Sequence, residues 1–198
     1  MTPKTIIFIG PQGSGKGTQI AKLYDVIAQT DPSRRIVDIQ TGRRFRALAA
    51  KRETFADKKI ADTLDSGELQ PDFITHLLWG QAMLDQLDSK SHLLIDGFPR
   101  NAHQARVLDN AFNFFERDKV IVVNLDTPED IVRARMSSRA RSDDTPESIE
   151  TRLRIYKEET LPLLEFYNNR DNTTVHDIDG TMDIDGVHNA ICEALNLA

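Results

Sequence analysis

The sequence has a single cysteine, Cys192, and no apolar run near the roughly 20 residues that a membrane-spanning helix needs. One cysteine excludes an internal disulfide and a zinc site built from several cysteines, so no structural zinc is expected. The apolar run that follows Met-Thr-Pro-Lys is short and is soon followed by glycines and Lys16, which is not the pattern of a signal peptide. We therefore expect a cytoplasmic protein that does not bind membranes.

Positive charge is also scarce. The 25 lysines and arginines are outnumbered by 31 acidic residues, which gives a formal net charge of −6. A general nucleic-acid binder needs a broad basic face, so we expect no nucleic-acid partner. Local charge can still oppose the total, and a polyphosphate site is not excluded. The arginines crowd into one window: Arg133, Arg135, Arg139, Arg141, Arg152 and Arg154.

Short apolar runs alternate with helical patterns along the 198 residues, which indicates βαβ units, a parallel sheet and a single α/β domain. Thr127 and Thr145 each precede Pro-Glu, and each is expected to cap a helix. The second of these helices is expected to reach about Tyr167, and a further helix is expected over 72–87. The predicted strands are Thr5–Ile9, Arg35–Ile39, His92–Ile95, Lys119–Leu125 and Thr173–Ile178, with possible insertions near 41–72 and 136–146.

A glycine-rich loop, Gly10-Pro-Gln-Gly-Ser-Gly-Lys-Gly-Thr18, follows the first predicted strand and precedes a helical pattern. It fits the first part of G-x-x-x-x-G-K-[ST], in which small residues let backbone N–H groups point at phosphate oxygens. The helix that follows adds its positive end, and Lys16 supplies a mobile cation. The strand before the loop and the helix after it make a ligand-free glycine turn a poor alternative.

One position departs from this motif, because Gly17 stands where a serine or threonine would bind magnesium. We therefore expect Mg²⁺ to be held through water molecules and through the phosphates themselves. Asp96 ends an apolar run, His92-Leu-Leu-Ile-Asp96, and could hold those waters. The alternative interpretation is that Asp96 only forms the turn before Gly97.

The loop ending Lys-Gly-Thr, together with Asp96-Gly-Phe-Pro-Arg100, resembles the adenylate kinase family. Three further segments resemble family motifs in the same order along the chain: Thr41-Gly-Arg-Arg-Phe-Arg46, Gly67-Glu-Leu-Gln-Pro-Asp72 and Asp143-Asp-Thr-Pro-Glu…Arg152-Leu-Arg-Ile-Tyr156. The resemblance implies a P-loop NTPase-type three-layer fold with a five-stranded parallel sheet. It also implies a helical acceptor-binding insertion at about 41–72 and a lid at about 136–146, which is very short here.

The resemblance also implies roles for individual residues. Lys16, Arg100, Arg139, Arg141 and Arg152 would be catalytic, and Asp96 would hold Mg²⁺ through water. The ATP site would be formed by Gly13, Ser14, Gly15, Lys16, Gly17, Thr18, Arg135, Arg139 and Gly180. The AMP site would be formed by Thr41, Arg46, Glu68, Leu69, Gln70, Gly97, Phe98, Pro99, Arg100, Gln104, Arg141 and Arg152.

Arginine suits such a site because its planar fork binds phosphate oxygens in pairs and stays charged near neutral pH. Arg133 and Arg154 are interpreted instead as surface residues that pair with nearby glutamates. Asp143 and Asp144 have two open interpretations: they orient the lid arginines, or they merely precede the cap at Thr145.

The expected reaction is reversible phosphoryl transfer from Mg-ATP to AMP. Gln104 offers a donor and an acceptor that match adenine, and related uridylate/cytidylate kinases usually have asparagine there and alanine in place of Thr41. Arg43 stands where the family usually has an acid. UMP/CMP kinase activity, a metabolite kinase and a non-catalytic nucleotide-binding regulator remain alternatives. We expect ATP, AMP and ADP as ligands and a monomeric chain.

Overall fold

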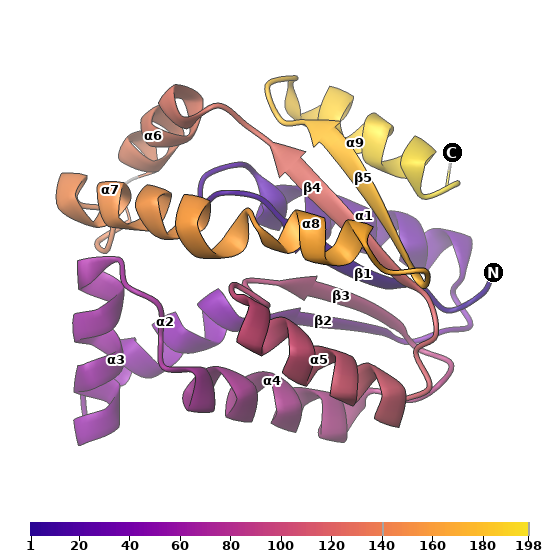
Figure 1. The fold of residues 1–198 in the computed structure, drawn as a ribbon, viewed down its shortest axis with the longest axis horizontal. Coiled ribbons are helices and arrows are strands. Elements are labelled where there is room, and N and C mark those ends of the chain that lie inside the picture. Colours follow the sequence, from indigo (N-terminus) through magenta and orange to yellow (C-terminus); the bar gives the residue numbers. More distant parts are fainter. Residues whose placement is uncertain (140, 198) are drawn as a thin grey trace.

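Five strands form one parallel sheet in the order β2-β3-β1-β4-β5 (Figure 1). This computed structural model describes residues 1–139 and 141–197. The strands lie close to the predicted segments, and the predicted α/β class with a five-stranded parallel sheet is confirmed. Their bounds are β1 Thr5–Ile9, β2 Ile36–Gln40, β3 His92–Asp96, β4 Val120–Asp126 and β5 Thr173–Asp179.

Helices cover both faces of the sheet because alternate strand residues point to opposite sides. Ile6 and Phe8 pack with α1 and α9, whereas Ile7 and Ile9 pack with α4, α5 and α8. The central strands β1, β3 and β4 are buried on both faces, which explains why their segments are largely hydrophobic runs, whereas the edge strands β2 and β5 carry polar and partly exposed residues. The bounds are α1 Lys16–Thr30, α4 Asp72–Gln86, α5 Ala102–Phe114, α8 Leu163–Asn168 and α9 Ile184–Ala194.

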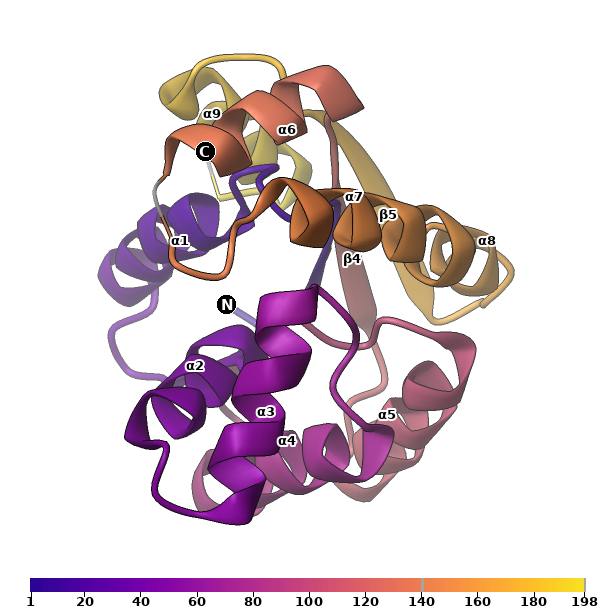
Figure 2. The same cartoon turned by 90° about the vertical axis from the view of Figure 1, so that its left-hand side faces the viewer.

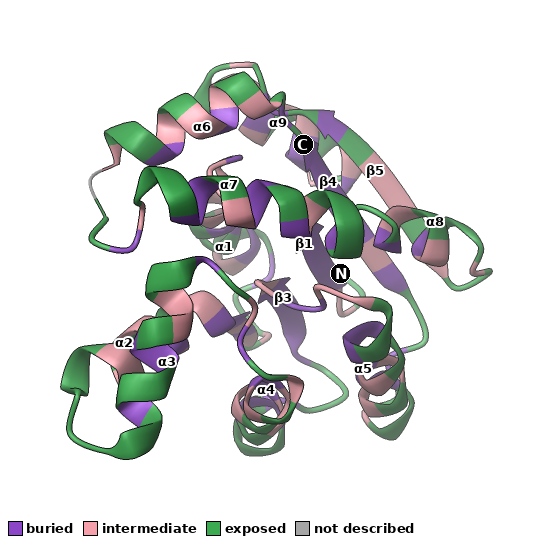
Figure 3. Ribbon diagram, turned by 60° about the vertical axis from the view of Figure 1, so that its left-hand side comes forward, coloured by how far each residue is buried: buried purple, intermediate pink, exposed green. Residues whose placement is uncertain are grey.

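The remaining helices gather beyond the carboxyl ends of the strands (Figures 1 and 2). They are α2 Thr41–Lys51, α3 Phe55–Ser66, α6 Glu129–Ser138 and α7 Pro146–Ile155. The outer surfaces of α2 and α3 are largely exposed, while buried residues line the sheet (Figure 3). The two helix pairs meet where the Arg152 guanidinium donates to the Leu64 carbonyl at 2.9 Å.

One local prediction is wrong, and a second holds with an interruption. Thr127 does not cap α6, because Pro128 occupies the cap position and the Thr127 hydroxyl is buried with no hydrogen bond among the described residues. The helical segment that begins after Thr145 does extend past Tyr167, but not as one α-helix: α7 ends at Ile155, a π-helical turn covers Tyr156–Thr160, and α8 follows. Pro162 explains the break: it has no N–H to donate, and its ring crowds the carbonyl four residues earlier. Thr145 does form the predicted cap, accepting from the Ser148 N–H.

Among the described residues, no helix has the length and apolar character needed to cross a bilayer. The same part of the chain contains no cluster of three or more metal-ligating His, Cys, Asp or Glu side chains.

Candidate functional site

A cavity of about 1010 Å³ opens at the carboxyl ends of the strands and is lined by both the glycine-rich loop and α2. In parallel α/β folds this edge is where ligands bind, at the point where strand order reverses. β1 lies between β3 and β4, so the reversal falls at the loop that follows β1. The cavity is large enough for more than one nucleotide-sized molecule.

The glycine-rich loop is packed tightly against the rest of the fold. Gly13 has φ +93°, and a Cβ there would lie 2.9 Å from Met136 of α6. Glycine is therefore required by both conformation and space. Gly180 is equally confined, since a Cβ would lie 2.0 Å from the Thr127 hydroxyl. These contacts bring the backbone of the loop and of Gly180 to the same end of the cavity.

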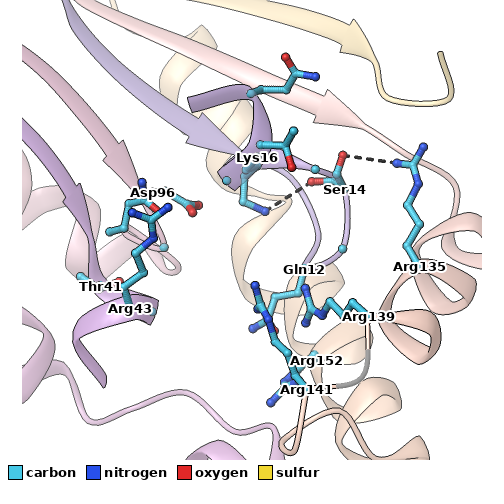
Figure 4. Close-up of a pocket in the computed structure, with 18 of the residues that line it drawn as sticks. Gln12, Ser14, Lys16, Thr41, Arg43, Asp96, Arg135, Arg139, Arg141 and Arg152 are labelled. Atoms are coloured by element: carbon cyan, nitrogen blue, oxygen red, sulfur yellow. Dashed lines mark hydrogen bonds between the residues drawn. The ribbon is translucent and has the colours of Figure 1, made fainter. Parts of the chain in front are cut away.

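Lys16 turns back over this loop and donates to the carbonyls of Gly10 at 2.7 Å and Pro11 at 2.8 Å. Burial lowers its pKa to about 8, although the nearby Asp96 carboxylate acts in the opposite direction. Figure 4 shows Lys16 between Asp96 and the arginines of the lid region. The Lys16 ammonium also lies 3.4 Å from the Ser14 hydroxyl and has no carboxylate partner among the described residues, so this partly buried cation could pair with a phosphate.

The Asp143-Asp144 pair fixes two of the predicted catalytic arginines. Arg152, with a side chain only 3% exposed, pairs with Asp143 at 2.8 Å and also with Asp144. Asp144 in turn receives a fork of hydrogen bonds from Arg139. Burial alone would raise the pKa of Asp144, but Arg139, Arg152 and Arg141 together hold it below its ordinary value. The Asp143 carbonyl also accepts from Ser148, so the pair both orients arginines and supports the start of α7.

Three further arginines line the cavity with no carboxylate partner in residues 1–139 and 141–197. Burial is the main cause that lowers the pKa of Arg46, Arg100 and Arg141, and repulsion between neighbouring cations adds to it. They stay charged because an arginine pKa lies so far above neutrality. Several cations that are not bound to a carboxylate, close together in one cavity, indicate a site for a ligand with several negative charges.

Arg133 and Arg154 behave as the sequence predicts. Arg133 pairs with Glu150 at 2.6 Å, and Arg154 pairs with Glu158 at 2.8 Å, both on exposed surface. Arg154 also lies 3.5 Å from Glu68, one of the predicted AMP-site residues.

Most of the predicted site residues meet in this one cavity. Its lining includes Gly13, Ser14, Gly15, Lys16, Gly17, Thr18, Thr41, Arg46, Glu68, Leu69, Gln70, Asp96, Gly97, Arg100, Gln104, Arg135, Arg139, Arg141, Arg152 and Gly180. Phe98 and Pro99 lie behind it and line a smaller neighbouring hollow instead. The Phe98 ring is 1% exposed and stacks on Trp79. Ala140, within the predicted lid, lies outside the described residues.

The residues around Asp96 fit a water-bound Mg²⁺. Its carboxylate stands at the end of β3, lines the cavity and has no hydrogen-bond or ion-pair partner among the residues that the structure describes. Carboxylate oxygen beside substrate phosphates is the setting that Mg²⁺ prefers. Arg43, on the same side in Figure 4, also lines the cavity.

Sequence reasoning missed several lining residues. Gln12 projects from the glycine-rich loop and lines both hollows. Gln12 occupies one of the unspecified positions of the G-x-x-x-x-G-K pattern, and its place inside that loop was the sequence signal that could have indicated it. Met182, Ile184 and Val187 form an apolar patch beside Gly180, and only their closeness to that glycine along the chain could have indicated it.

Comparison with known proteins agrees with this geometry. The family model described as adenylate kinase matches residues 8–172. Adenylate kinase 1 of Nostoc sp. is 41% identical over 83% of this chain and 85% of its own length. The adenylate kinase of Corynebacterium urealyticum is 36% identical over 83% and 86%, and that of Leuconostoc mesenteroides is 34% identical over 98% and 97%. The chain belongs to the adenylate kinase family.

Proposed function

We propose that this protein is an adenylate kinase that reversibly transfers a phosphoryl group from Mg-ATP to AMP and yields two ADP. The observation that carries the proposal is a single cavity whose two ends differ. The glycine-rich loop, Arg135 and Gly180 form one end, and Thr41 and Gln104 line the other. Lys16 and the arginines lie between them. The adenylate kinase names of the relatives support the same reaction.

ATP would bind at the end formed by the glycine-rich loop. Backbone N–H groups from Gly13 to Thr18 would face its phosphates, and the start of α1 would add its positive dipole. The Arg135 guanidinium donates to the Gly180 carbonyl at 3.1 Å, which holds both residues beside the expected base position. Met182 and Ile184 supply apolar surface there.

AMP would bind at the end formed by α2 and the segment after β3. Arg46 and Arg100 would hold its phosphate, and Gln104 would meet its base. Thr41 is 1% exposed and faces Gly97, where a Cβ would lie 2.6 Å from the Thr41 hydroxyl. Glu68, Leu69 and Gln70 would close this end from the side of α3, where the Gln70 amide donates to the Ile60 carbonyl. Phe98 and Pro99 would contribute through their backbone.

Transfer between the two sites needs positioning and charge stabilisation more than covalent chemistry. Lys16, Arg139, Arg141 and Arg152 would surround the migrating group, whose charge is spread over its equatorial oxygens. Asp96 would hold water ligands of Mg²⁺, and the ion when bound would neutralise phosphate oxygens. The donor and acceptor oxygens could then approach in line.

Water competes with AMP as the acceptor, so the site must close around both nucleotides. We propose that residues 41–72 form the acceptor-binding part and residues 136–146 the lid. Arg139 and Arg152, both bound to Asp144, link the two ends of this lid. All proposed roles lie within one chain, which supports a monomer, and the nucleotide substrates fit a cytoplasmic location.

A coupled assay with ATP and each of AMP, UMP, CMP and GMP tests the proposal. We expect AMP to be the best acceptor by at least about tenfold in kcat/KM. A clear preference for UMP or CMP would replace it with a pyrimidine nucleotide kinase, and inactivity with every monophosphate would reject both. ATP hydrolysis measured with and without AMP tests the lid, because an effective lid keeps hydrolysis far below transfer.

A further inference from the structure

The Gln104 side chain is held from two sides although it lines the cavity. It is 2% exposed. Its Oε1 accepts from the Arg100 backbone N–H at 2.8 Å, and its Nε2 donates to Asp72 Oδ1 at 2.7 Å. Asp72 does not line the cavity itself, so it contacts Gln104 from behind.

These two partners fix which way the Gln104 amide points. A backbone N–H can only donate and a carboxylate can only accept, so each end of the amide has one permitted orientation. A flipped amide would place an NH₂ group against the Arg100 N–H and an oxygen against the Asp72 carboxylate. Two partly buried hydrogen bonds would be lost, and groups of the same polarity would face each other.

Asn101 supports the same arrangement. Its Oδ1 accepts from the Gln104 backbone N–H at 2.8 Å, and its Nδ2 lies 3.4 Å from Asp72 Oδ1. Asp72 at the start of α4 is thereby tied to the start of α5, 29 to 32 residues later in the chain.

The fixed amide has one N–H and one oxygen lone pair left for a ligand. A 6-aminopurine matches them, because its amino group donates to Oε1 while its ring nitrogen accepts from Nε2. In the same pose a 6-oxopurine presents an oxygen and a ring N–H, so both contacts become repulsive. A site built around fixed polar groups rejects such a ligand strongly because buried groups are left unpaired.

We propose that Asp72 is a positioning residue that selects 6-aminopurine over 6-oxopurine monophosphates by locking the Gln104 amide. The inference rests on the proposed place of Gln104 in the acceptor site. An acid in the first turn of α4 would also stabilise that helix, and such a role would affect both purines equally. The ratio of AMP to inosine monophosphate (IMP) activity therefore separates the two roles.

The test measures kcat/KM for AMP and IMP in the wild type and in Asp72→Ala, Asp72→Asn, Gln104→Ala and the double variant. We expect Asp72→Ala to reduce the AMP preference about tenfold, with kcat/KM for ATP within about twofold of wild type. Asp72→Asn should keep most of the preference, because its Oδ1 can still accept from Gln104. In the Gln104→Ala background, Asp72→Ala should change nothing further.

Glu147→Ala is the matched control, since Glu147 is an exposed acid in the first turn of α7 and does not line the cavity. It should leave the ratio unchanged. If Asp72→Ala lowers both activities equally while Gln104→Ala abolishes the preference, the lock is refuted and the acceptor site stands. If Gln104→Ala leaves the preference intact, the placement of Gln104 is refuted and the lock with it. Should Asp72→Ala fail to fold, Asp72→Ser takes its place, because the shorter side chain keeps a polar group at the start of α4 but withdraws the oxygen from Gln104. An unchanged ratio of AMP to IMP activity in folded Asp72→Ser would refute the lock.

Discussion

The two ends of the β-sheet bury cations in opposite ways. At the amino end, Arg117 is 6% exposed and its guanidinium donates to the Thr5 hydroxyl and to the carbonyls of Lys4 and Asp88. At the carboxyl end, Lys16 contacts only oxygens of its own loop, and Arg46 has no hydrogen-bond or ion-pair partner within the described ranges. Burial lowers the pKa of all three.

The contrast separates a structural cation from a binding cation. Arg117 joins segments that are far apart in the chain and so contributes to folding, because removing it leaves acceptors unpaired and separates those segments, whereas the hydrogen bonds of Lys16 stay within its own loop. A partly buried cation without a bound anion is a cost to folding, and under the proposed function a nucleotide phosphate would offset it. Substitutions of cations at the carboxyl end should therefore lower activity, and substitutions of cations at the amino end should lower stability.

The largest effect is expected from Lys16→Met. Turnover should fall on the order of a thousandfold, since one charge on the migrating phosphoryl group is worth about 4 kcal/mol. The free energy of unfolding should change by no more than about 1 kcal/mol, because the loss of the Lys16 hydrogen bonds to its own loop is offset by the removal of a partly buried charge that has no ion-pair partner among the described residues. The coupled assay and urea unfolding measure the two quantities on one preparation. Near-normal turnover would remove Lys16 from its proposed role.

Arg117→Met is the reverse experiment at the amino end. We expect a loss of about 2–3 kcal/mol in the free energy of unfolding, because the Thr5 hydroxyl and the Asp88 carbonyl lose their donor. Turnover per folded molecule should remain within about twofold of wild type. A loss of turnover as large as that of Lys16→Met, in protein shown to be folded by circular dichroism, would contradict the division.

The fold could be predicted largely from sequence because both faces of the sheet are covered. A central strand such as Thr5–Ile9 is then a largely apolar run that can be recognised without knowing its neighbours. Helix starts were less reliable. Thr127 has the residue type of a cap, but its hydroxyl lies against Gly180, 53 residues later, and tertiary packing overrides the local signal.

Within the site, too, contiguous segments could be predicted from the sequence, whereas contacts between separate segments could not. The glycine-rich loop is one contiguous segment, so its position between β1 and α1 could be predicted from its sequence alone. Asp144 binds Arg139 on one side and Arg152 on the other, and the sequence left two interpretations of it open. The contact between Asp72 and Gln104 joins positions 32 residues apart, and no short motif contains both. Such pairings depend on how separate helices meet.

From the lowered pKa of Lys16 we also predict that catalytic activity depends on pH. Burial lowers its pKa to about 8, so the free protein loses this charge as the pH rises through that value. Because kcat/KM reports the free enzyme, kcat/KM for ATP should fall about tenfold per pH unit above 8. Bound phosphates favour the charged form, so kcat should hold to higher pH. Lys16→Arg should be less active but flat over pH 7–9.5, and an equally steep fall in that variant would assign the titration to another group.

The smallest effect is expected at the amino end, from His92. The ring is fully buried; its Nδ1 accepts from the Lys4 backbone N–H at 3.1 Å, and its Nε2 lies 3.4 Å from Asp31. Burial lowers the pKa of His92 below 6.5, and the Asp31 carboxylate opposes this shift only in part. The unfolded chain therefore binds the proton more readily, so stability is complete above about pH 6.5 and declines as the pH falls below it. The slope is at most about 1.4 kcal/mol per pH unit and ends at the folded-state pKa.

His76 and His188 also have lowered pKa values, so the quantity to measure is the difference between wild type and His92→Gln in urea unfolding from pH 7.5 to 5. Glutamine can accept from Lys4 and donate to Asp31 without titrating, and this variant should lose part of the dependence. Equal slopes in the two proteins would show that the Asp31 pair offsets the burial of His92, and that the amino end of the sheet is indifferent to pH in this range.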